Sequence, residues 1–227
     1  MTPTPRRPAG HPWLDLRDAV TGLVVEGLED AGAAAALDAA GAFAAAGPGE
    51  GSAPPVGEAA ERLKRAGILD RSGRLAPEAV RRRRYLAERA RRAAVARAGL
   101  ARPAPPDLEG LPPELYRAAW LVRAGLYFEA HDLLEGQWRR ASGETRELYQ
   151  GVIQMAVALE HAVTGNRAGS VSLLEAARAR LAPLGGAGAG LDLEALRTGL
   201  ARAAAALGAG APFDPALVPP LVAAGRR

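Results

Sequence analysis

Residues 148–163, with the sequence LYQGVIQMAVALEHAV, constrain the fold of this chain more than any other stretch. Their apolar side chains occupy nearly every face of a helical wheel, and such a helix is buried at the centre of its domain because no face suits water. The few polar residues share one narrow stripe, formed by Gln150, Gln154 and His161. The stretch therefore predicts an all-α domain organised around one buried helix that carries a polar stripe.

The preceding segment, YFEAHDLLEGQW over residues 127–138, has the pattern of a second amphipathic helix. Phe128, His131, Glu135 and Trp138 follow spacings of three, four and three residues, so they share one face. In a helical hairpin this face can meet the polar stripe of the buried helix. Because buried polar groups need hydrogen-bond partners, we expect a shielded network inside the bundle. Its expected members are His131, Glu135, Gln150, Gln154 and His161.

A repeat at a shift of forty residues indicates paired helices. Gly125 corresponds to Gly165, and Leu133–Glu135 corresponds to Leu173–Glu175. Each copy reads as a helix, a glycine turn and a second helix, as in tetratricopeptide-type hairpins, although the period is longer than theirs. We expect Gly165 to end the buried helix and Asn166 to cap the next one. The predicted fold class is all-α, a compact bundle of αα-hairpins with an extra helical N-terminal region.

The largest apolar residues predict the core of this bundle. We expect Ile153, Met155 and Leu159 of the buried helix to pack on Leu134 and Trp138. A buried Trp138 would make its truncation to alanine cost roughly 3–5 kcal/mol.

Three motifs, YFEAHDLLEGQW, LYQGVIQMAVALEHAVTGN and SLLEAARARL, together resemble the helical family known as domain of unknown function 309. The resemblance covers roughly a third of the chain and implies a compact all-helical fold, but it implies no activity. The usual His-Glu pair of the family is His131-Asp132 here, and the shorter acid weakens any role for that carboxylate. The residues that carry the resemblance are Phe128, Glu129, His131, Glu135, Trp138, Gln150, Gly151, Gln154, Ala156, Gly165 and Asn166.

Proline-rich and glycine-rich stretches divide the chain into five predicted segments. These are a disordered tail over 1–12, an N-terminal helical region over 13–100, a proline-rich linker over 101–112, the helical bundle over 113–207 and an irregular tail over 208–227. Asp192 is the expected cap of the last helix. In the N-terminal region we expect helices over 13–27, 33–46, 58–66 and 77–98, and a turn joining two very short strands over 68–75.

Composition narrows the class of protein. The chain has no cysteine, which excludes disulfides and thiolate metal sites and favours a cytoplasmic protein. The first dozen residues lack the apolar core of a signal peptide, and no later run is apolar enough to span a membrane. We therefore expect no membrane partner. Assembly into a homo-oligomer stays open.

The 77–98 helix is rich in arginine, and two functions fit it. Arginines can neutralise phosphates, so the Arg81–Arg97 helix is a candidate for nucleic-acid binding. The alternative is a solvated helix in a chain whose basic residues are almost all arginine, with Lys64 as the only lysine. The candidate contacts to phosphate are Arg81, Arg82, Arg83, Arg84, Arg89 and Arg92.

Two further functions compete for the polar residues of the bundle. Imidazole and carboxylate on facing helices can hold a divalent metal, which makes His131, Glu135 and His161 candidate ligands, and a His131–Glu135 pair can also serve acid–base catalysis. The sequence lacks the Glu-x-x-His repeats of di-iron bundles, the paired histidines of metalloproteases and the serine-hydrolase and phosphate-loop motifs. We therefore favour a structural network in a non-enzymatic interaction or scaffold protein with a protein partner. The metal-dependent or acid–base enzyme is the alternative.

Overall fold

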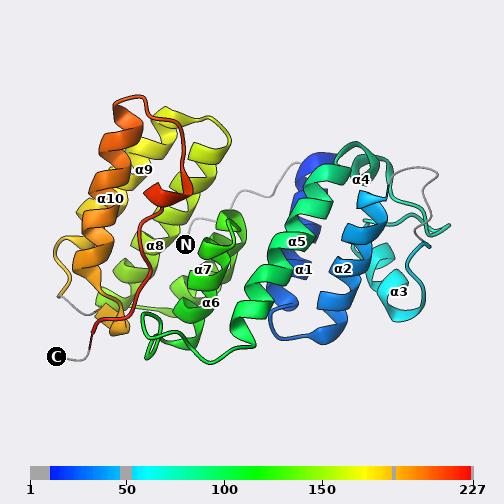
Figure 1. The fold of residues 1–227 in the computed structure, drawn as a ribbon, viewed down its shortest axis with the longest axis horizontal. Helices are drawn as coiled ribbons and strands as arrows, with labels where there is room; N and C mark the ends of the chain where they lie inside the picture. Colours follow the sequence, from blue (N-terminus) through cyan, green and yellow to red (C-terminus); the bar gives the residue numbers. More distant parts are fainter. Residues whose placement is uncertain (1–10, 47–52, 186–187, 226–227) are drawn as a thin grey trace. The chain divides into compact units, whose positions relative to one another are not determined.

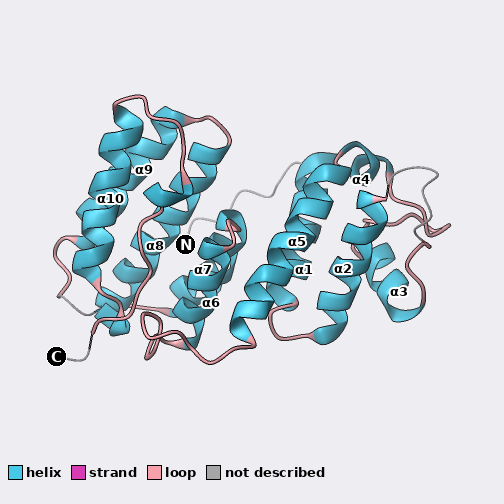
Figure 2. Cartoon of the chain, in the orientation of Figure 1, coloured by secondary structure: helices cyan, strands magenta, loops and turns pink. Residues whose placement is uncertain are grey.

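The computed structural model describes residues 11–46, 53–185 and 188–225, and these form an all-α fold, as predicted (Figures 1 and 2). Within them, β structure is limited to two isolated bridges, Leu69 to Leu75 and Leu191 to Ala223. No helix in these ranges is long and apolar enough to cross a membrane. The helices are α1 Pro12–Glu26, α2 Ala31–Ala45, α3 Gly57–Arg65, α4 Pro77–Arg81, α5 Arg83–Leu100, α6 Pro113–Arg123, α7 Tyr127–Arg140, α8 Gly143–Val163, α9 Arg167–Leu181, η1 Gly188–Gly190, α10 Leu193–Gly208 and η2 Pro215–Leu217.

The chain divides into two compact units between Ala94 and Val95, inside α5. We call them the N-terminal unit and the C-terminal unit. The expected disordered tail falls almost wholly on residues 1–10, which lie outside the described ranges, while Pro12 already belongs to α1. The other predicted segment boundaries, including the linker over 101–112, stay predictions.

The C-terminal unit is built on α8, whose apolar pattern stood out in the sequence. Helices that follow one another in the chain pack together from α6 to α10, so α8 contacts α7 on one side and α9 on the other. Met155 and Leu159 of α8 and Leu134 of α7 are fully buried. A Cβ atom at Gly151 would lie 2.6 Å from a methyl group of Leu181, so the glycine allows α8 and α9 to approach closely.

Trp138 departs from the predicted core, because its side chain is only half-buried. It lies in the last turns of α7, where Arg146 of α8 covers it: the guanidinium carbon sits 4.0 Å from the ring centroid. The same guanidinium donates a hydrogen bond to the Trp138 carbonyl at 2.9 Å. The ring therefore packs under a cation near solvent, and its truncation should cost less than the loss of a core tryptophan.

The predicted helix ends are confirmed at two positions. The Asn166 side chain accepts a hydrogen bond from the Gly169 amide at 3.1 Å, which caps α9. Asp192 accepts from the Ala195 amide at 2.9 Å, which caps α10. Gly165, between α8 and α9, has φ +84°, a left-handed conformation that glycine adopts at no steric cost.

The N-terminal unit packs α1 against α2 and α2 against α3 around fully buried Val20, Leu37 and Leu63. After α3, the expected pair of short strands is reduced to the single bridge from Leu69 to Leu75. The carboxylate of Asp70 closes this turn by accepting hydrogen bonds from the Ser72 amide, the Ser72 hydroxyl and the Arg74 amide.

The predicted continuous helix over 77–98 is wrong, because the chain breaks at Arg82 into α4 and α5. Arg82 leaves the helical region with φ −109° and ψ 24°. Its guanidinium turns toward α1, where it lies 4.8 Å from the Trp13 ring centroid, and its Nε donates to Glu78 at 3.2 Å. The local sequence favours one continuous helix. The helix is interrupted at the residue whose side chain contacts α1 and α4.

Candidate functional site

His131 and Glu135 lie one turn apart on α7, as the spacing predicts. His131 Nε2 is 3.3 Å from one Glu135 oxygen, and the other oxygen accepts a hydrogen bond from Arg139 one turn further on. The side chain of His131 is 19% exposed and that of Glu135 is 32% exposed. Glu135 makes no hydrogen bond to Gln150 or Gln154 within the described part of the chain. This histidine–carboxylate–arginine row therefore runs along α7 rather than across to α8.

The second nitrogen of His131 restricts what this row can do chemically. Nδ1 is buried and has no hydrogen-bond partner in the described structure. A general base must reach the proton that it removes, by direct contact or through one water. Here Nε2 contacts Glu135 and Nδ1 faces the interior beside the Phe128 ring, whose centroid is 5.4 Å from that of the imidazole. In this conformation Nδ1 is therefore shielded from a substrate, and Nε2 is in contact with Glu135.

Gln154 belongs to a different contact, between α8 and α9. Its side-chain oxygen accepts a hydrogen bond from Arg180 Nε at 3.2 Å. The same guanidinium forms an ion pair with Glu147, which lies about two turns before Gln154 on α8. Arg180 thus ties two points of α8 to α9.

His161 forms a third contact, at the turn between α8 and α9. Its Nδ1 lies 2.8 Å from the side-chain nitrogen of Asn166. Because the Asn166 oxygen already accepts from Gly169, the amide nitrogen faces the imidazole and donates to Nδ1. His161 therefore supports the cap of α9.

The described structure does not join the predicted polar residues into one hydrogen-bonded network. The structure brings together His131 with Glu135, Gln154 with Arg180 and His161 with Asn166, and Gln150 is half-buried without a recorded partner among these side chains. Within the described residues no group of three or more His, Asp or Glu side chains lies close enough to hold a metal ion. The predicted ligand set of His131, Glu135 and His161 is accordingly not assembled.

Helix length explains why the network divides. Helix α7 has 14 residues and α8 has 21, and only Ala141 and Ser142 connect them. Because both rise by the same distance per residue, the last turns of α8 extend past the beginning of α7. His161 lies in that extension and cannot reach His131. Residues that share one face of α8 can therefore contact different helices.

Glu129, which the sequence analysis named only among the residues that carry the family resemblance, is a buried acid. It is 0% exposed and, with Thr21 and Ser170, makes up the buried polar residues of the described structure. It occupies the third position of α7, where free backbone N–H groups and the helix dipole favour a carboxylate. An acid three residues after the N-cap is the signal that could have identified it.

Tyr149, on α8, has a shifted pKa. Burial raises the pKa of the Tyr149 phenol, and the negative charge of Glu114 on α6 raises it further. The tyrosine therefore keeps its proton at neutral pH and acts there as a neutral hydrogen-bonding group.

Most of the arginines proposed to contact phosphate already have partners within the chain. Glu78 pairs with Arg81 and Arg82, and Glu88 pairs with Arg91 and Arg92. Hydrogen bonds from Arg91 and Arg92 lower the pKa of Glu88 to about 2. Arg89 lies over the Tyr85 ring at 5.1 Å. Of the six candidates, only Arg83 and Arg84 have no recorded partner in the described residues.

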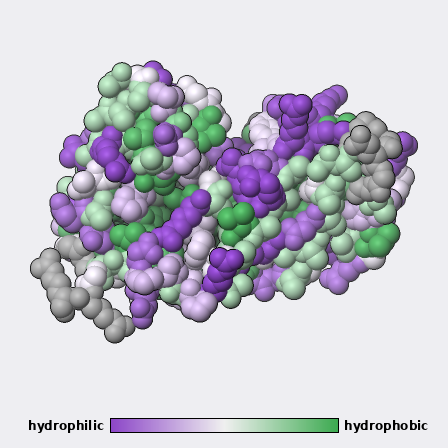
Figure 3. Space-filling model, viewed as in Figure 1, coloured by the Kyte–Doolittle hydropathy of each residue, from purple (hydrophilic) through white to green (hydrophobic). Residues whose placement is uncertain are grey.

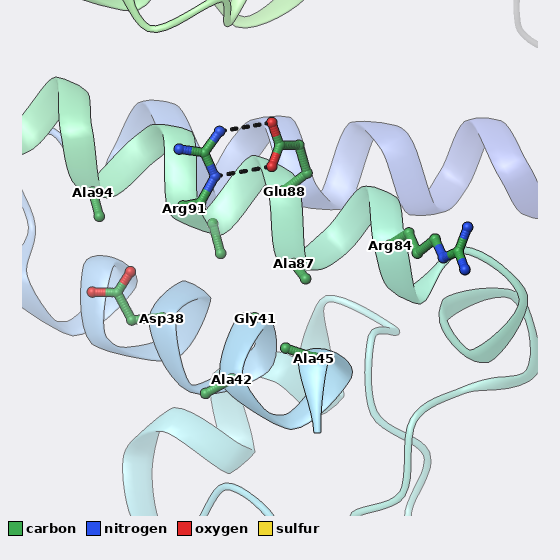
Figure 4. Close-up of a pocket in the computed structure, with 10 residues that line it drawn as sticks. Asp38, Gly41, Ala42, Ala45, Arg84, Ala87, Glu88, Arg91 and Ala94 are labelled. Atoms are coloured by element: carbon green, nitrogen blue, oxygen red, sulfur yellow. Dashed lines mark hydrogen bonds and ion pairs between the residues drawn. The ribbon is translucent and has the colours of Figure 1, made fainter. Parts of the chain in front are cut away.

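A groove of about 510 Å³ lies between α2 and α5 in the N-terminal unit (Figure 4). Small side chains line its floor. The two helices are in close contact there, since a Cβ atom at Gly41 would come within 2.4 Å of the Ala90 methyl group. Figure 4 shows the paired Glu88 and Arg91 along the α5 edge and Asp38 on the α2 side. The floor consists of Gly41, Ala42, Ala45, Ala87, Ala90 and Ala94, and Arg84 completes the edge.

Comparison with protein families matches residues 115–173 to DUF309, a domain of unknown function. This segment resembles DUF309. It runs from α6 through α7 and α8 into α9, and it includes every residue of the predicted polar site. Comparisons with curated proteins and with solved structures found no match.

Proposed function

We propose that this protein is a non-enzymatic interaction module that binds an amphipathic helix of a partner protein in the α2–α5 groove. The groove is the observation that carries the proposal, because it is an open apolar surface with charged edges. The structure of the DUF309-like segment is also consistent with a scaffold role. Its polar side chains tie helices together: Gln154 of α8 accepts a hydrogen bond from Arg180 of α9, and Arg146 of α8 donates to the Trp138 carbonyl of α7.

The shape of the groove defines the partner. Alanine and glycine on both helices leave the volume empty, so the partner must supply large side chains, and a helix does so at positions i, i+3, i+4 and i+7. Each fully buried leucine would contribute about 1.5–3 kcal/mol of transfer free energy before the costs of association. Figure 3 shows pale, weakly hydrophobic surface along α2 and α5, bordered by hydrophilic side chains.

Charge sets the orientation of the partner helix. Arg84 and the Glu88–Arg91 pair lie on the α5 edge, so Arg84 supplies its positive charge, and Asp38 lies on the α2 edge. A helix with acidic residues on the flank that faces α5 would be favoured, and a helix with reversed flanks would bring like charges together. Such edge charges affect orientation and association rate more than affinity.

A designed peptide tests this proposal. The probe is an 18-residue helix with leucine at i, i+3, i+4 and i+7 and glutamate along one flank, a length of roughly five turns. We expect binding to the full chain by fluorescence anisotropy. Ala42→Arg should weaken it at least tenfold, because Ala42 is exposed on the groove floor and the new side chain would fill the groove.

Ala35→Arg is the matched control, because Ala35 is also an exposed alanine of α2 but does not line the groove. It should leave peptide affinity unchanged. Equal loss in both variants would contradict the groove as the binding site. A chain that forms dimers, and loses them with Ala42→Arg while ignoring the peptide, would show that a second copy occupies the groove instead.

A further inference from the structure

The residues after α10 form a strap that is anchored to the helices of the C-terminal unit. We define the C-terminal strap as residues 211–224, which include η2 and an extended stretch. In Figure 1 it is the red segment that runs from the end of α10 along the bundle. The Ala223 amide donates to the Asp107 carbonyl at 2.7 Å, the Ala224 amide donates to Gly190 at 2.8 Å, and the Val222 carbonyl accepts from Asp192 at 2.9 Å.

A glycine of α10 receives the two prolines of the strap. A Cβ atom at Gly199 would lie 2.6 Å from Pro220 Cδ and 2.9 Å from Pro219 Cα, so no other residue leaves room for this contact. Val218, just before the prolines, has φ −62° and ψ 122°, which is near the polyproline II region. Leu221 follows the prolines and is 4% exposed. The face thus has the features of a receptor for an extended proline-containing segment.

The strap does not fill the space beneath it. A partly open pocket of about 350 Å³ lies between Pro215 and Val218–Val222 of the strap and the side chains of Ala119, Val122 and Tyr127 on α6 and α7, and the Asp107–Arg123 ion pair also lines it. Empty volume of this kind forfeits the dispersion contacts that a larger side chain would make. A segment with the same prolines and a bulkier residue at the Val218 position would bind this face better than the strap does.

The strap is also attached in a way that allows exchange. It leaves α10 at Gly208 and turns at Gly210, whose φ of +93° is a left-handed conformation. Beyond this point it is held by a few backbone bonds, by buried Leu221 and by the Phe213 ring, whose centroid is 6.1 Å from that of Tyr127. Two arginines also donate to its carbonyl groups: Arg202 to Ala216 at 3.1 Å and Arg167 to Ala211 at 3.4 Å. Segments with few hydrogen bonds open locally at a small fraction of the global free energy of unfolding.

We propose that the face formed by α6, α7 and α10 is a second binding site, which takes an extended Pro-Pro segment of a partner protein and which the C-terminal strap covers in the absence of that partner. The strap defines the chemistry of the ligand: an extended backbone, two adjacent prolines against Gly199 and a large apolar side chain over the cavity. This site is separate from the α2–α5 groove, so each can fail without the other.

The test supplies the strap in trans to the full chain. The probe is a fluorescent peptide with the sequence of residues 212–224, and the readout is anisotropy. Ala223→Pro removes the amide that bonds to Asp107, so it should release the strap and strengthen peptide binding at least tenfold over wild type. Leu221→Asp is a second release variant, which loses a buried anchor and should give the same increase.

Gly199→Ala, added to either release variant, identifies the site. Alanine favours a helix more than glycine does, so α10 should persist, yet the new Cβ occupies the space of Pro219 and Pro220 and should abolish peptide binding. A peptide with Val218→Trp should bind about tenfold more tightly than the native sequence, because it fills the cavity.

Several results would overturn the proposal. Peptide binding that is the same in wild type and in both release variants means that the strap covers no receptor. Binding that survives Gly199→Ala places the peptide elsewhere. A weaker Val218→Trp peptide removes the cavity from the site. Concentration-dependent dimers of the release variants, lost with Gly199→Ala, would assign the face to the strap of a second copy rather than to a partner.

Discussion

At the scale of residues, two glutamates of α7 show how position decides the role of the same side chain. Glu135 is 32% exposed and shares its carboxylate between His131 and Arg139, whose own side chain is 66% exposed. Glu129 is fully buried at the first turn of the same helix. Solvent screens the ion pairs of Glu135. Water does not reach the buried carboxylate of Glu129, so that carboxylate depends on the protein groups around it.

We therefore expect the two glutamates to differ in their contribution to stability. Glu129→Ala should lower the free energy of unfolding by roughly 1–3 kcal/mol, because it removes a fully buried acid from the first turn of α7, where backbone N–H groups and the helix dipole favour a carboxylate. Glu135→Ala should cost less than about 1 kcal/mol, because it removes only a partly exposed ion pair. Urea denaturation at neutral pH, with m-values compared between variants, measures both. Equal losses would show that the His131–Glu135–Arg139 row supports the fold as strongly as the buried acid does.

Glu135→Gln separates the structural role from the enzymatic alternative. The amide keeps the shape of the carboxylate and most of its hydrogen-bonding capacity, so we expect an unchanged unfolding midpoint and no effect on peptide binding. Metal analysis of the purified chain supplies the opposing result. Stoichiometric metal that is lost in both Glu135→Gln and His131→Ala would establish a metal centre at this pair.

At the scale of elements, α5 is held by charge pairs within its own turns. Glu88 bonds to Arg91 and Arg92, one turn ahead of it, in the direction that suits the helix dipole. The same pairing lowers the positive charge that this helix offers to an external partner. The kink at Arg82 has a similar effect, because it turns a guanidinium toward the Trp13 ring.

The pairing of Glu88 predicts a stability that depends on pH. Its pKa is about 2 in the folded protein and near the ordinary value of 4.5 in the unfolded chain. A lowered carboxylate pKa stabilises the fold above pH 4.5, and this contribution is lost as pH falls toward 2. Glu88 is 41% exposed, so solvent screening limits the effect to less than about 1 kcal/mol. The difference in stability between wild type and Glu88→Gln should therefore shrink between pH 4.5 and pH 2, as measured by urea denaturation. A constant difference would contradict the pairing.

At the scale of the whole molecule, charge limits the affinity that this protein can have for nucleic acid. The formal net charge is only +4 over 227 residues. Of the candidate phosphate contacts, Arg83 and Arg84 are the pair without recorded partners in the described residues. An interface of this size releases few counterions, so its affinity should depend weakly on salt.

We expect binding to random DNA with a plot of log affinity against log salt no steeper than about −1.8, the value for two phosphate contacts. The double variant Arg83→Gln, Arg84→Gln should flatten this slope. Titrations between 50 and 200 mM salt, roughly the range over which such slopes are resolved, supply the measurement. A slope several times steeper, unchanged in the double variant, would revive a broad nucleic-acid interface on other arginines.

The sequence by itself determined the helices apart from the break at Arg82, the central position of α8 and the caps at Asn166 and Asp192. These features depend on periodicity and on hydrogen bonds within a few residues, so they can be derived from neighbours in the chain. The His131–Glu135 contact is local in the same sense. The resemblance of residues 115–173 to DUF309 was readable for the same reason, since its motifs are contiguous.

The tertiary structure alone decided which surfaces these helices meet. Periodicity gives the angle of a side chain around its own helix, but not the length or register of the helix beside it. For this reason Gln154 faces Arg180, His161 extends past α7 and Trp138 lies under Arg146 instead of in the core. The α2–α5 groove and the cover over Gly199 arise in the same way, because both depend on contacts between residues that are distant in sequence.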